Sequence, residues 1–299
     1  MFKLDNKKQV FISLAILLLV LLGLFLLKSN TPRLSSPEYQ QERLLRFSYE
    51  ITNRGIAPIN NAHFSSYFPI ASMPYQSSGD IQTTNQFTIE EGAWGNRVAH
   101  FDLGFIPPYG KKIVKFVTTI KTAIQPNYLP NDKFDKYLID EKYIEKNTQK
   151  IIDLAEKLKA SSDIDTVKNI YDWASQNIKY TGYVAADKGA LSAIETLSGD
   201  CTEYMYTVVA LARALGIPAR GIGGYVYPNN AIVSPNDYHN WAEVYFNRRW
   251  HIVDAQKKQL MPNNGDYIAM RILSDKSTSL LGSSHRFSIA DDNLSVRMN

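Results

Sequence analysis

Cysteine is almost absent from this sequence: Cys201 is the only one among 299 residues. A single cysteine excludes an internal disulfide and also a zinc site built from several thiolates. Two interpretations of Cys201 remain open at this point. It is either a small buried hydrophobic residue, which is a common environment for free cysteine, or a reactive thiol.

Several other signals are also missing. Lys and Arg are scattered among acidic residues, with a net charge of +4 and no long basic run, so we expect no nucleic-acid binding. There is no P-loop, dinucleotide-binding fingerprint or H-E-x-x-H motif, and we expect no cofactor. Asp200 and Glu203 alone provide too few ligands to define a metal site, so none is predicted. The hydrophobic content of 44% is nevertheless enough for folded cores and excludes global disorder.

The N-terminus contains one long apolar run. Residues 10–27 carry no charge, and a helix of ~20 such residues crosses a bilayer, with ~17 as the lower limit. Lys3, Lys7 and Lys8 precede the run and favour a cytoplasmic N-terminus. We therefore expect a cytoplasmic tail at 1–9, a transmembrane signal-anchor at 10–27, and the rest of a single-pass protein outside the membrane, in the periplasm or at the cell surface.

Two alternatives exist for this run. The apolar core of a cleaved signal peptide is usually ~7–15 residues long and ends in a small-x-small site, which fits less well. A buried core helix fits poorly with a terminal segment that is so uniformly apolar.

Composition and periodicity divide the remaining chain. Residues 28–40 are polar and contain two prolines, as expected of a tether. Apolar residues alternate at 45, 47, 49 and 51, and turn signals separate similar segments over 41–125, which predicts a small β-sandwich. A linker at 126–147 precedes a region of helical periodicity, which opens a second domain at 148–260. Residues 261–299 form a C-terminal extension, expected to complete a sheet or cover a cleft.

The sequence around Cys201 favours the reactive interpretation. Gly199 and Asp200 are turn and capping residues, and the apolar segment after them is helical until Gly216 and Pro218. Cys201 therefore lies in the first turn of a buried helix. A helix N-terminus is one of the settings that lower the pKa of a thiol below its usual ~8.5.

Residues 238–254 predict a β-hairpin with a polar turn near residues 247–249. With a two-residue loop, paired positions sum to an odd number near 495 or 497. His239 and Asp254 then lie on the same face, opposite or diagonal to each other, and His251 lies on the other face. The hairpin can therefore place a carboxylate beside an imidazole, which sets the tautomer and orientation of the ring.

Three segments together resemble the transglutaminase-like superfamily: G-D-C-T-E at 199–203, G-I-P-A-R at 216–220, and H-N-W-A-E-V-Y-F at 239–246 with W-H-I-V-D at 250–254. The resemblance covers roughly residues 148–256 and includes Tyr180. It implies an α+β chain with a papain-like Cys-His-Asp core, in which helices pack on an antiparallel sheet. The preceding β-domain is similar to that of exported bacterial members.

The resemblance also implies residue roles. Cys201 is expected to be the nucleophile, His239 the general acid/base and Asp254 the orienting carboxylate, with the Cys201 amide as one oxyanion donor. Possible oxyanion or supporting residues are Trp173, Tyr180, Trp241, Glu203 and Arg220, and for Trp173 simple core packing is the stronger alternative. The calcium sites of animal transglutaminases cannot be traced in this sequence.

The expected reaction is attack on an amide bond, in a Gln side chain or a peptide bond of a protein or peptide substrate, through a Cys201 thioester. Water as acceptor makes the enzyme an amidase or peptidase, and an amine makes it an acyltransferase. An alternative is a membrane-tethered binding or assembly module with little catalysis. A papain-type protease with Asn as the third residue shares the chemistry, but Asp254 and the G-I-P-A-R segment favour the transglutaminase-like branch.

Overall fold

The structure is a computed structural model that describes residues 38–92, 94–128, 134–183, 186–226, 232–274, 280–281 and 286–299, all within one compact unit, Pro37–Asn299. The predicted tail at 1–9, the transmembrane segment at 10–27 and most of the tether at 28–40 lie outside the described residues. Within these ranges, no helix has the length and apolar character needed to span a bilayer. The mixed helix-and-sheet fold predicted from the sequence is confirmed.

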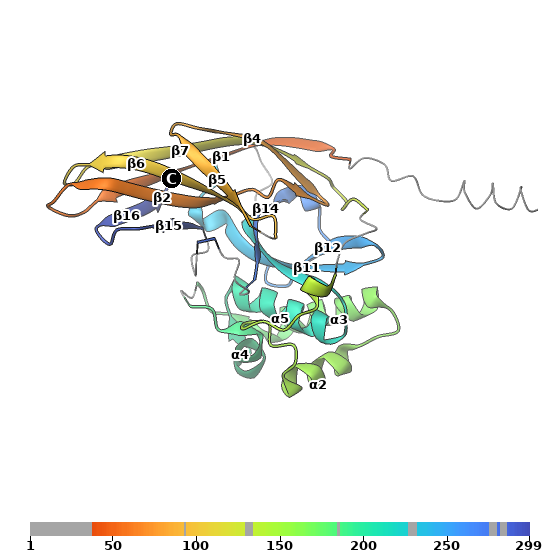
Figure 1. The fold of residues 1–299 in the computed structure, drawn as a ribbon. Coiled ribbons are helices and arrows are strands. Elements are labelled where there is room, and N and C mark those ends of the chain that lie inside the picture. Colours follow the sequence, from red (N-terminus) through yellow and green to blue (C-terminus); the bar gives the residue numbers. More distant parts are fainter. Residues whose placement is uncertain are drawn as a thin grey trace, which may run out of the picture. The chain divides into compact units, whose positions relative to one another are not determined.

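Two sheets pack face to face as a sandwich (Figure 1). One has the strand order β16-β1-β7-β4-β3 and the other β15-β2-β6-β5. The bounds are β1 Gln41–Asn53, β2 Ile59–Phe68, β3 Ser72–Met73, β4 Gln76–Thr83, β5 Phe87–Glu91, β6 Arg97–Ile106, β7 Lys111–Thr122, β15 Phe287–Ile289 and β16 Leu294–Met298. The predicted alternation is present in β1, where Leu45, Phe47, Tyr49 and Ile51 are buried.

Aromatic rings fill the space between the two sheets. Phe116 of β7 stacks on Phe47 of β1 with ring centroids 4.6 Å apart, and it contacts Phe68 and Phe101 of the opposite sheet edge-on. Large rings that interlock in this way bury much apolar area and favour a single arrangement of the sheets. These rings belong to a hydrophobic core that also includes Tyr225, Ile268 and Met270 from later in the chain.

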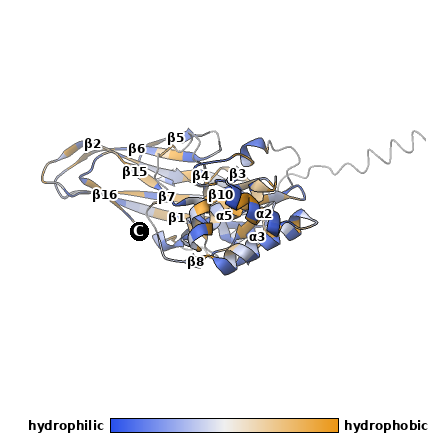
Figure 2. Cartoon of the chain, turned by 90° about the horizontal axis from the view of Figure 1, so that it is seen from below, coloured by the Kyte–Doolittle hydropathy of each residue, from blue (hydrophilic) through white to orange (hydrophobic). Residues whose placement is uncertain are grey.

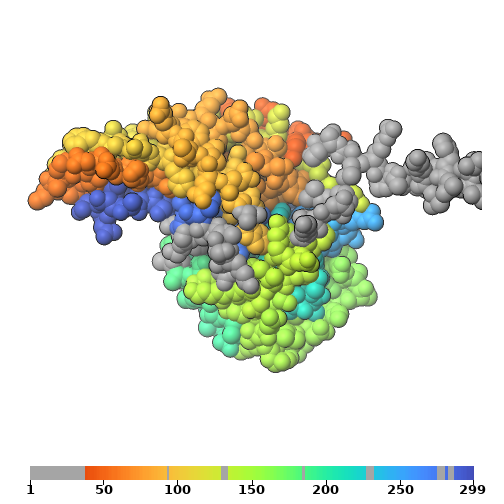
Figure 3. Space-filling view, viewed as in Figure 1, coloured from red at the N-terminus to blue at the C-terminus, as the bar shows by residue number. Residues whose placement is uncertain are grey.

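The C-terminal residues contribute strands to more than one sheet. β14 (Tyr267–Leu273) completes a different sheet, whereas β15 and β16 return to the sandwich. There, β16 pairs with the second half of β1 and β15 pairs with β2, so the last strands lie against the first ones (Figure 3). These pairings satisfy backbone groups on strands that would otherwise be exposed sheet edges.

The other sheet is antiparallel, in the order β13-β12-β11-β10-β14. Its further strands are β10 Ala219–Val226, β11 Tyr238–Phe246, β12 Arg249–Asp254 and β13 Gln259–Leu260. The helices α2 Gln149–Leu158, α3 Asp163–Asn177, α4 Gly189–Thr196 and α5 Cys201–Ala214 lie on the side away from the sandwich (Figure 1). The short elements are β8 Lys179–Tyr180, β9 Ser198–Gly199 and the 3-10 turns Asp135–Tyr137, Pro235–Asp237 and Asn264–Asp266.

This sheet is buried on both faces. Ala242, Val244 and Phe246 of β11 belong to the core that contains α5, whereas Trp241 belongs to a core shared with Ile70 and other sandwich residues. Residues 201–214 of α5 are almost all buried, while the outward sides of α2 and α3 are largely hydrophilic (Figure 2). The near-continuous apolar sequence of α5 therefore reflects its central position between the other helices and the sheet.

Two side-chain amides attach the sandwich to the outer edge of β14. Gln76 accepts from the Ala269 N–H (2.8 Å) and donates to the Ala269 carbonyl (3.0 Å). Asn96 does the same with Ile272, at 2.6 and 2.8 Å. Both amides are buried, and each replaces the hydrogen bonds that a neighbouring strand would make. The position of β14 is therefore determined by the sandwich as well as by its own sheet.

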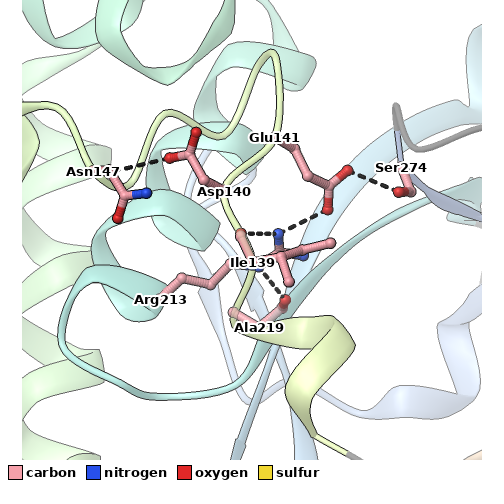
Figure 4. A network of polar contacts seen from close by, with 7 residues as sticks. All are labelled: Ile139, Asp140, Glu141, Asn147, Arg213, Ala219 and Ser274. Carbon is pink, nitrogen blue, oxygen red and sulfur yellow. Dashed lines mark hydrogen bonds and ion pairs between the residues drawn. The ribbon is translucent and has the colours of Figure 1, made fainter.

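The C-terminal end of α5 lies at a buried ion pair (Figure 4). Arg213 Nη1 is 2.8 Å from Glu141 Oε1 and also donates to the Ile139 carbonyl at 2.9 Å, while Nε donates to the Ala219 carbonyl at 2.8 Å. Ser274 donates to the second Glu141 oxygen at 2.8 Å. The segment before α2 is thus fastened to the end of α5 and to the start of β10.

Candidate active site

Cys201 is the first residue of α5, as the sequence predicted. Asp200 caps the helix, because its Oδ1 accepts from the Thr202 N–H at 2.7 Å, and Glu203 accepts from the Asp200 N–H at 3.0 Å. This reciprocal pattern is a capping box. A Cβ at Gly199 would lie 2.4 Å from the Cβ of Glu203, so only glycine fits this turn.

Glu203 is completely buried and has a second contact outside the helix. Its Oε1 accepts from the Lys188 N–H at 2.9 Å, and burial is the main cause that raises its pKa. Glu203 therefore ties the turn before Cys201 to the start of α4. Of the supporting roles predicted for Glu203, this geometry favours positioning of the backbone around the thiol.

The predicted hairpin register is confirmed. Asn247 and Arg248 form a two-residue turn with φ of 48° and 62°, which is the backbone of a type I′ turn. Tyr245 pairs with Trp250 and Ala242 with Val253, so paired positions sum to 495. His251 lies on the other face and stacks on Phe246 with ring centroids 4.0 Å apart.

His239 and Asp254 meet on the shared face of this hairpin. His239 Nε2 lies 2.8 Å from Asp254 Oδ2, and both side chains are buried. Because Asp254 binds Nε2, the other ring nitrogen, Nδ1, is the one that can exchange a proton with a reacting group. The position of this pair follows from the two-residue turn.

β11 also brings the residue after His239 into contact with the thiol. The Asn240 N–H, one residue after His239, donates to the Cys201 sulfur, and the Asn240 side chain donates to the Thr202 hydroxyl at 2.9 Å. Residues 239–240 and 201–202 therefore form one junction between strand and helix. The structure brings together the three residues to which the sequence assigned catalytic roles.

The thiol does not have the lowered pKa that its helix position suggested. Burial is the largest cause and the negative charge of Asp200 the second in raising the pKa of Cys201 to about 11, whereas the Asn240 N–H and the Thr202 hydroxyl act in the opposite direction. The helix N-terminus favours an anion, but the same turn already holds the Asp200 carboxylate. Cys201 is therefore a neutral thiol at pH 7 and needs a base at the moment of attack.

Two residues missing from the sequence-based site surround Asp254. Tyr267 of β14 donates its hydroxyl to Asp254 Oδ2 at 3.0 Å, and the Lys257 N–H donates to Oδ1 at 3.0 Å. No sequence signal distinguished Tyr267, because it is one of several apolar and aromatic residues in a short strand. Its role becomes visible only when β14 is placed beside β10.

The predicted supporting residues occupy different environments. Tyr180 is 49% exposed and lies near the thiol, because β8 pairs with β9 so that Tyr180 is opposite Gly199. Burial raises the pKa of Tyr180, and the charges of Cys201 and Asp200 contribute. Trp241 is buried and stacks on His239 at 6.5 Å. Trp173, on α3, packs against the core that contains α5.

Arg220 lies on the sandwich side of the sheet, in a buried ion pair with Glu243 at 2.7 Å. The guanidinium also lies 4.1 Å from the centre of the Trp250 ring, and Tyr75 of the sandwich donates its hydroxyl to the same Glu243. In the part of the chain that the structure describes, no group of three or more His, Cys, Asp or Glu residues is placed to hold a metal ion.

Comparison with known proteins agrees with this geometry. Residues 152–255 match the family model described as Transglutaminase-like superfamily. Over 105 residues the chain is 27% identical to the kyphoscoliosis peptidase of Mus musculus, an alignment that covers 32% of the chain and only 16% of that protein's length.

Solved structures are similar over a longer stretch. A protein from Cytophaga hutchinsonii, described as a candidate cysteine protease, has a TM-score of 0.60 at 19% identity, covering 88% of this chain and 92% of that one. This likeness shows a shared fold that includes the sandwich. The periplasmic domain of TgpA from Pseudomonas aeruginosa has a TM-score of 0.40 at 13% identity, covering 71% of this chain and 88% of that one.

Proposed function

We propose, from the transglutaminase-like domain that residues 152–255 form, that this chain is a cysteine enzyme that attacks amide carbonyls of protein or peptide substrates. One observation carries the proposal: His239 Nε2 lies 2.8 Å from Asp254 Oδ2 in a buried pair, and the N–H of Asn240, the residue after His239, donates to the sulfur of Cys201 at the start of α5. Nucleophile, base and orienting carboxylate are the three parts that thioester chemistry requires.

The first half of the reaction transfers one proton twice. As Sγ of Cys201 attacks the carbonyl carbon, the thiol proton moves to Nδ1 of His239, and the carbonyl oxygen becomes an oxyanion. The Cys201 N–H at the helix start is one donor to that oxyanion, and Tyr180 is our candidate for a second. When the C–N bond breaks, His239 returns the proton to the departing amine and a thioester remains on Cys201.

The raised thiol pKa decides how this step begins. With its pKa raised to about 11, the Cys201 thiol is mostly protonated at pH 7, so attack requires transfer of the thiol proton to His239. The thioester then reacts with water, giving hydrolysis, or with an amine, giving transamidation. Exclusion of water from the thioester determines which acceptor wins.

We also propose that the domain acts outside the cell membrane, as a single-pass protein. The support is the uncharged run at residues 10–27 with three lysines before it. Alkaline carbonate extraction of membranes tests the anchor. Protease treatment of intact spheroplasts tests the orientation. Full release by carbonate contradicts the anchor, and full protection from protease contradicts the orientation.

The enzymatic proposal is tested with dimethylated casein as a glutamine substrate, by measuring ammonia release and incorporation of a fluorescent amine. Cys201→Ala is expected to abolish both signals, and the wild-type protein is expected to yield a covalent acyl adduct at Cys201 by intact mass. If peptide cleavage is the reaction, a casein digest monitored by mass spectrometry replaces the ammonia signal. Activity that persists unchanged in Cys201→Ala contradicts the mechanism.

The same hairpin supplies a matched control. His239→Gln is expected to lower the rate of Cys201 alkylation by iodoacetamide at neutral pH, whereas His251→Gln, on the opposite face, is expected to leave it unchanged. Equal alkylation rates in all three proteins, together with no turnover, would instead support a tethered binding module.

A further inference from the structure

Tyr267 contacts the carboxylate that orients His239. Its hydroxyl donates to Asp254 Oδ2 at 3.0 Å, and this is the same oxygen that lies 2.8 Å from His239 Nε2. Tyr267 is 2% exposed and Asp254 is 1% exposed, so water does not replace either contact. Two donors, a phenol and an imidazole, therefore converge on one buried carboxylate oxygen.

The opposite carboxylate oxygen is also held. Lys257 N–H donates to Oδ1 at 3.0 Å, so the two oxygens of Asp254 are fixed by donors from β14, from β11 and from the turn after β12. A buried carboxylate needs such donors, because desolvation of an unpaired charge is strongly unfavourable. The hydroxyl of Tyr267 stays protonated as a donor, because burial and the charge of Asp254 both raise its pKa far above the ordinary value.

The ring of Tyr267 also contributes to the position of the imidazole. It packs edge-on against Trp241, with centroids 5.0 Å apart and planes at 73°. Trp241 in turn stacks on His239 with planes at 25°. Tyr267 therefore contacts the triad by two routes, through its hydroxyl to Asp254 and through its ring and Trp241 to His239.

The backbone that carries Tyr267 is itself firmly held. Tyr267 pairs with Val226 of β10, and two residues later Ala269 is bonded to the Gln76 amide of the sandwich. Just before it, Asp266 forms an ion pair with Arg43 of β1 at 3.2 Å. The Tyr267 phenol is thus positioned by contacts from both the sheet that contains β10 and β14 and the sandwich.

We propose that Tyr267 is a positioning residue of the active site: its hydroxyl holds the Asp254 carboxylate in the orientation that aims His239 at Cys201. The proposal rests on the proposed function above. When His239 receives the thiol proton, Asp254 faces an imidazolium, and a carboxylate free to rotate would align it less well. The phenol restricts that rotation without taking part in proton transfer.

Tyr267→Phe tests the proposal, because it removes the hydroxyl and keeps the ring against Trp241. Loss of one hydrogen bond to a charged group predicts a fall in kcat of about 10- to 100-fold, with KM changed less than about twofold. Tyr225→Phe is the matched control, since Tyr225 is a buried tyrosine of β10 whose hydroxyl contacts Met298 at 3.3 Å. Its kcat is expected to equal that of the wild type.

A double-mutant cycle distinguishes positioning from general packing. If Tyr267 acts through Asp254, adding Tyr267→Phe to Asp254→Ala lowers kcat by less than about threefold further. Wild-type kcat in Tyr267→Phe, or a full 10- to 100-fold loss on top of Asp254→Ala, overturns the proposal.

The rate of Cys201 alkylation by iodoacetamide at pH 7 provides a readout that requires no substrate. Tyr267→Phe is expected to slow it in the same direction as His239→Gln, and Tyr225→Phe is expected to leave it unchanged. A slow alkylation rate in His239→Gln with a normal rate in Tyr267→Phe contradicts the role proposed for Tyr267 but leaves the proposed function intact. Normal rates and turnover in both His239→Gln and Asp254→Ala would contradict the proposed function itself.

Discussion

The two ends of helix α5 both lie in buried polar networks, but their charges are arranged in opposite ways. At the C-terminal end, Arg213 and Glu141 form a 2.8 Å ion pair in which both side chains are no more than 2% exposed. At the N-terminal end, carboxylates surround the thiol: Asp200 caps the helix, and Asp254 adds a second negative charge that disfavours the thiolate of Cys201.

This difference separates a structural network from a reactive one. The helix dipole favours a cation at its C-terminus, and Arg213 meets both that preference and the charge of Glu141. At the N-terminus the dipole favours an anion, and Asp200 already takes that place through the Thr202 N–H. The thiol therefore remains protonated, and His239 must accept its proton before Cys201 can act as a nucleophile.

The largest expected effect is at the N-terminal end. Asp254→Asn keeps the shape of the side chain but favours the wrong tautomer of His239, so kcat on casein should fall by about 10³- to 10⁴-fold. The free energy of unfolding should change by less than about 2 kcal/mol, measured by urea titration. If Asp254→Asn keeps a tenth or more of the wild-type kcat, the N-terminal end of α5 would not be the reactive one of the two networks.

The C-terminal end should show the reverse pattern. Arg213→Met breaks the buried ion pair with Glu141, and breaking a buried pair costs about 3–5 kcal/mol of unfolding free energy. Well below the melting temperature, kcat should stay within about twofold of the wild type. Lys168→Met is the control, because its ion pair with Asp172 is exposed and should contribute less than about 1 kcal/mol.

A second substitution sharpens that result. In Arg213→Met/Glu141→Leu both charges are removed, and most of the lost stability should return. If the double variant is as unstable as Arg213→Met, the loss comes from packing of the Arg213 side chain and not from the broken ion pair.

The raised pKa of Cys201 predicts a loss of stability at high pH. Folding raises this pKa to about 11, so between pH 9 and pH 11 the unfolded chain releases the thiol proton first and stability falls as pH rises. A shift of two units corresponds to about 2–3 kcal/mol. Urea unfolding at pH 8 and pH 11 should show this extra loss in the wild type relative to Cys201→Ser, and equal losses would contradict the raised pKa.

The smallest expected effect concerns Asp200. Asp200→Asn keeps a good helix cap but removes the charge that raises the pKa of Cys201, so alkylation by iodoacetamide at pH 8 should become roughly threefold faster. Asp165→Asn, at the start of α3, is the control and should not change the rate. A slower reaction in Asp200→Asn would mean that the carboxylate helps the thiol instead of opposing its ionisation.

Local sequence patterns predicted the parts of the site that depend on local geometry. Gly199 and Asp200 indicated the start of α5, and the spacing of His239 and Asp254 around a two-residue turn indicated their shared face. Strand periodicity likewise predicted the alternation in β1. In each case the controlling interaction joins residues close in sequence, so the pattern carries the information.

Other features depend on contacts between distant segments. The return of β15 and β16 to the sandwich, the amides of Gln76 and Asn96 on the edge of β14, and the phenol of Tyr267 on Asp254 join residues that no periodicity relates. The direction of the pKa shift of Cys201 also depends on such contacts. A helix start lowers the pKa of an exposed thiol, but burial and two carboxylates raise this one.

The sequence by itself therefore determined which residues carry the proposed chemistry, because a capped helix start and a hairpin register are local properties of the chain. Only the tertiary structure decided the state in which that chemistry begins. The depth at which Cys201 is buried, the carboxylates that meet around it and the phenol that holds Asp254 all arise from packing between helix, sheet and sandwich, and packing sets both desolvation and charge.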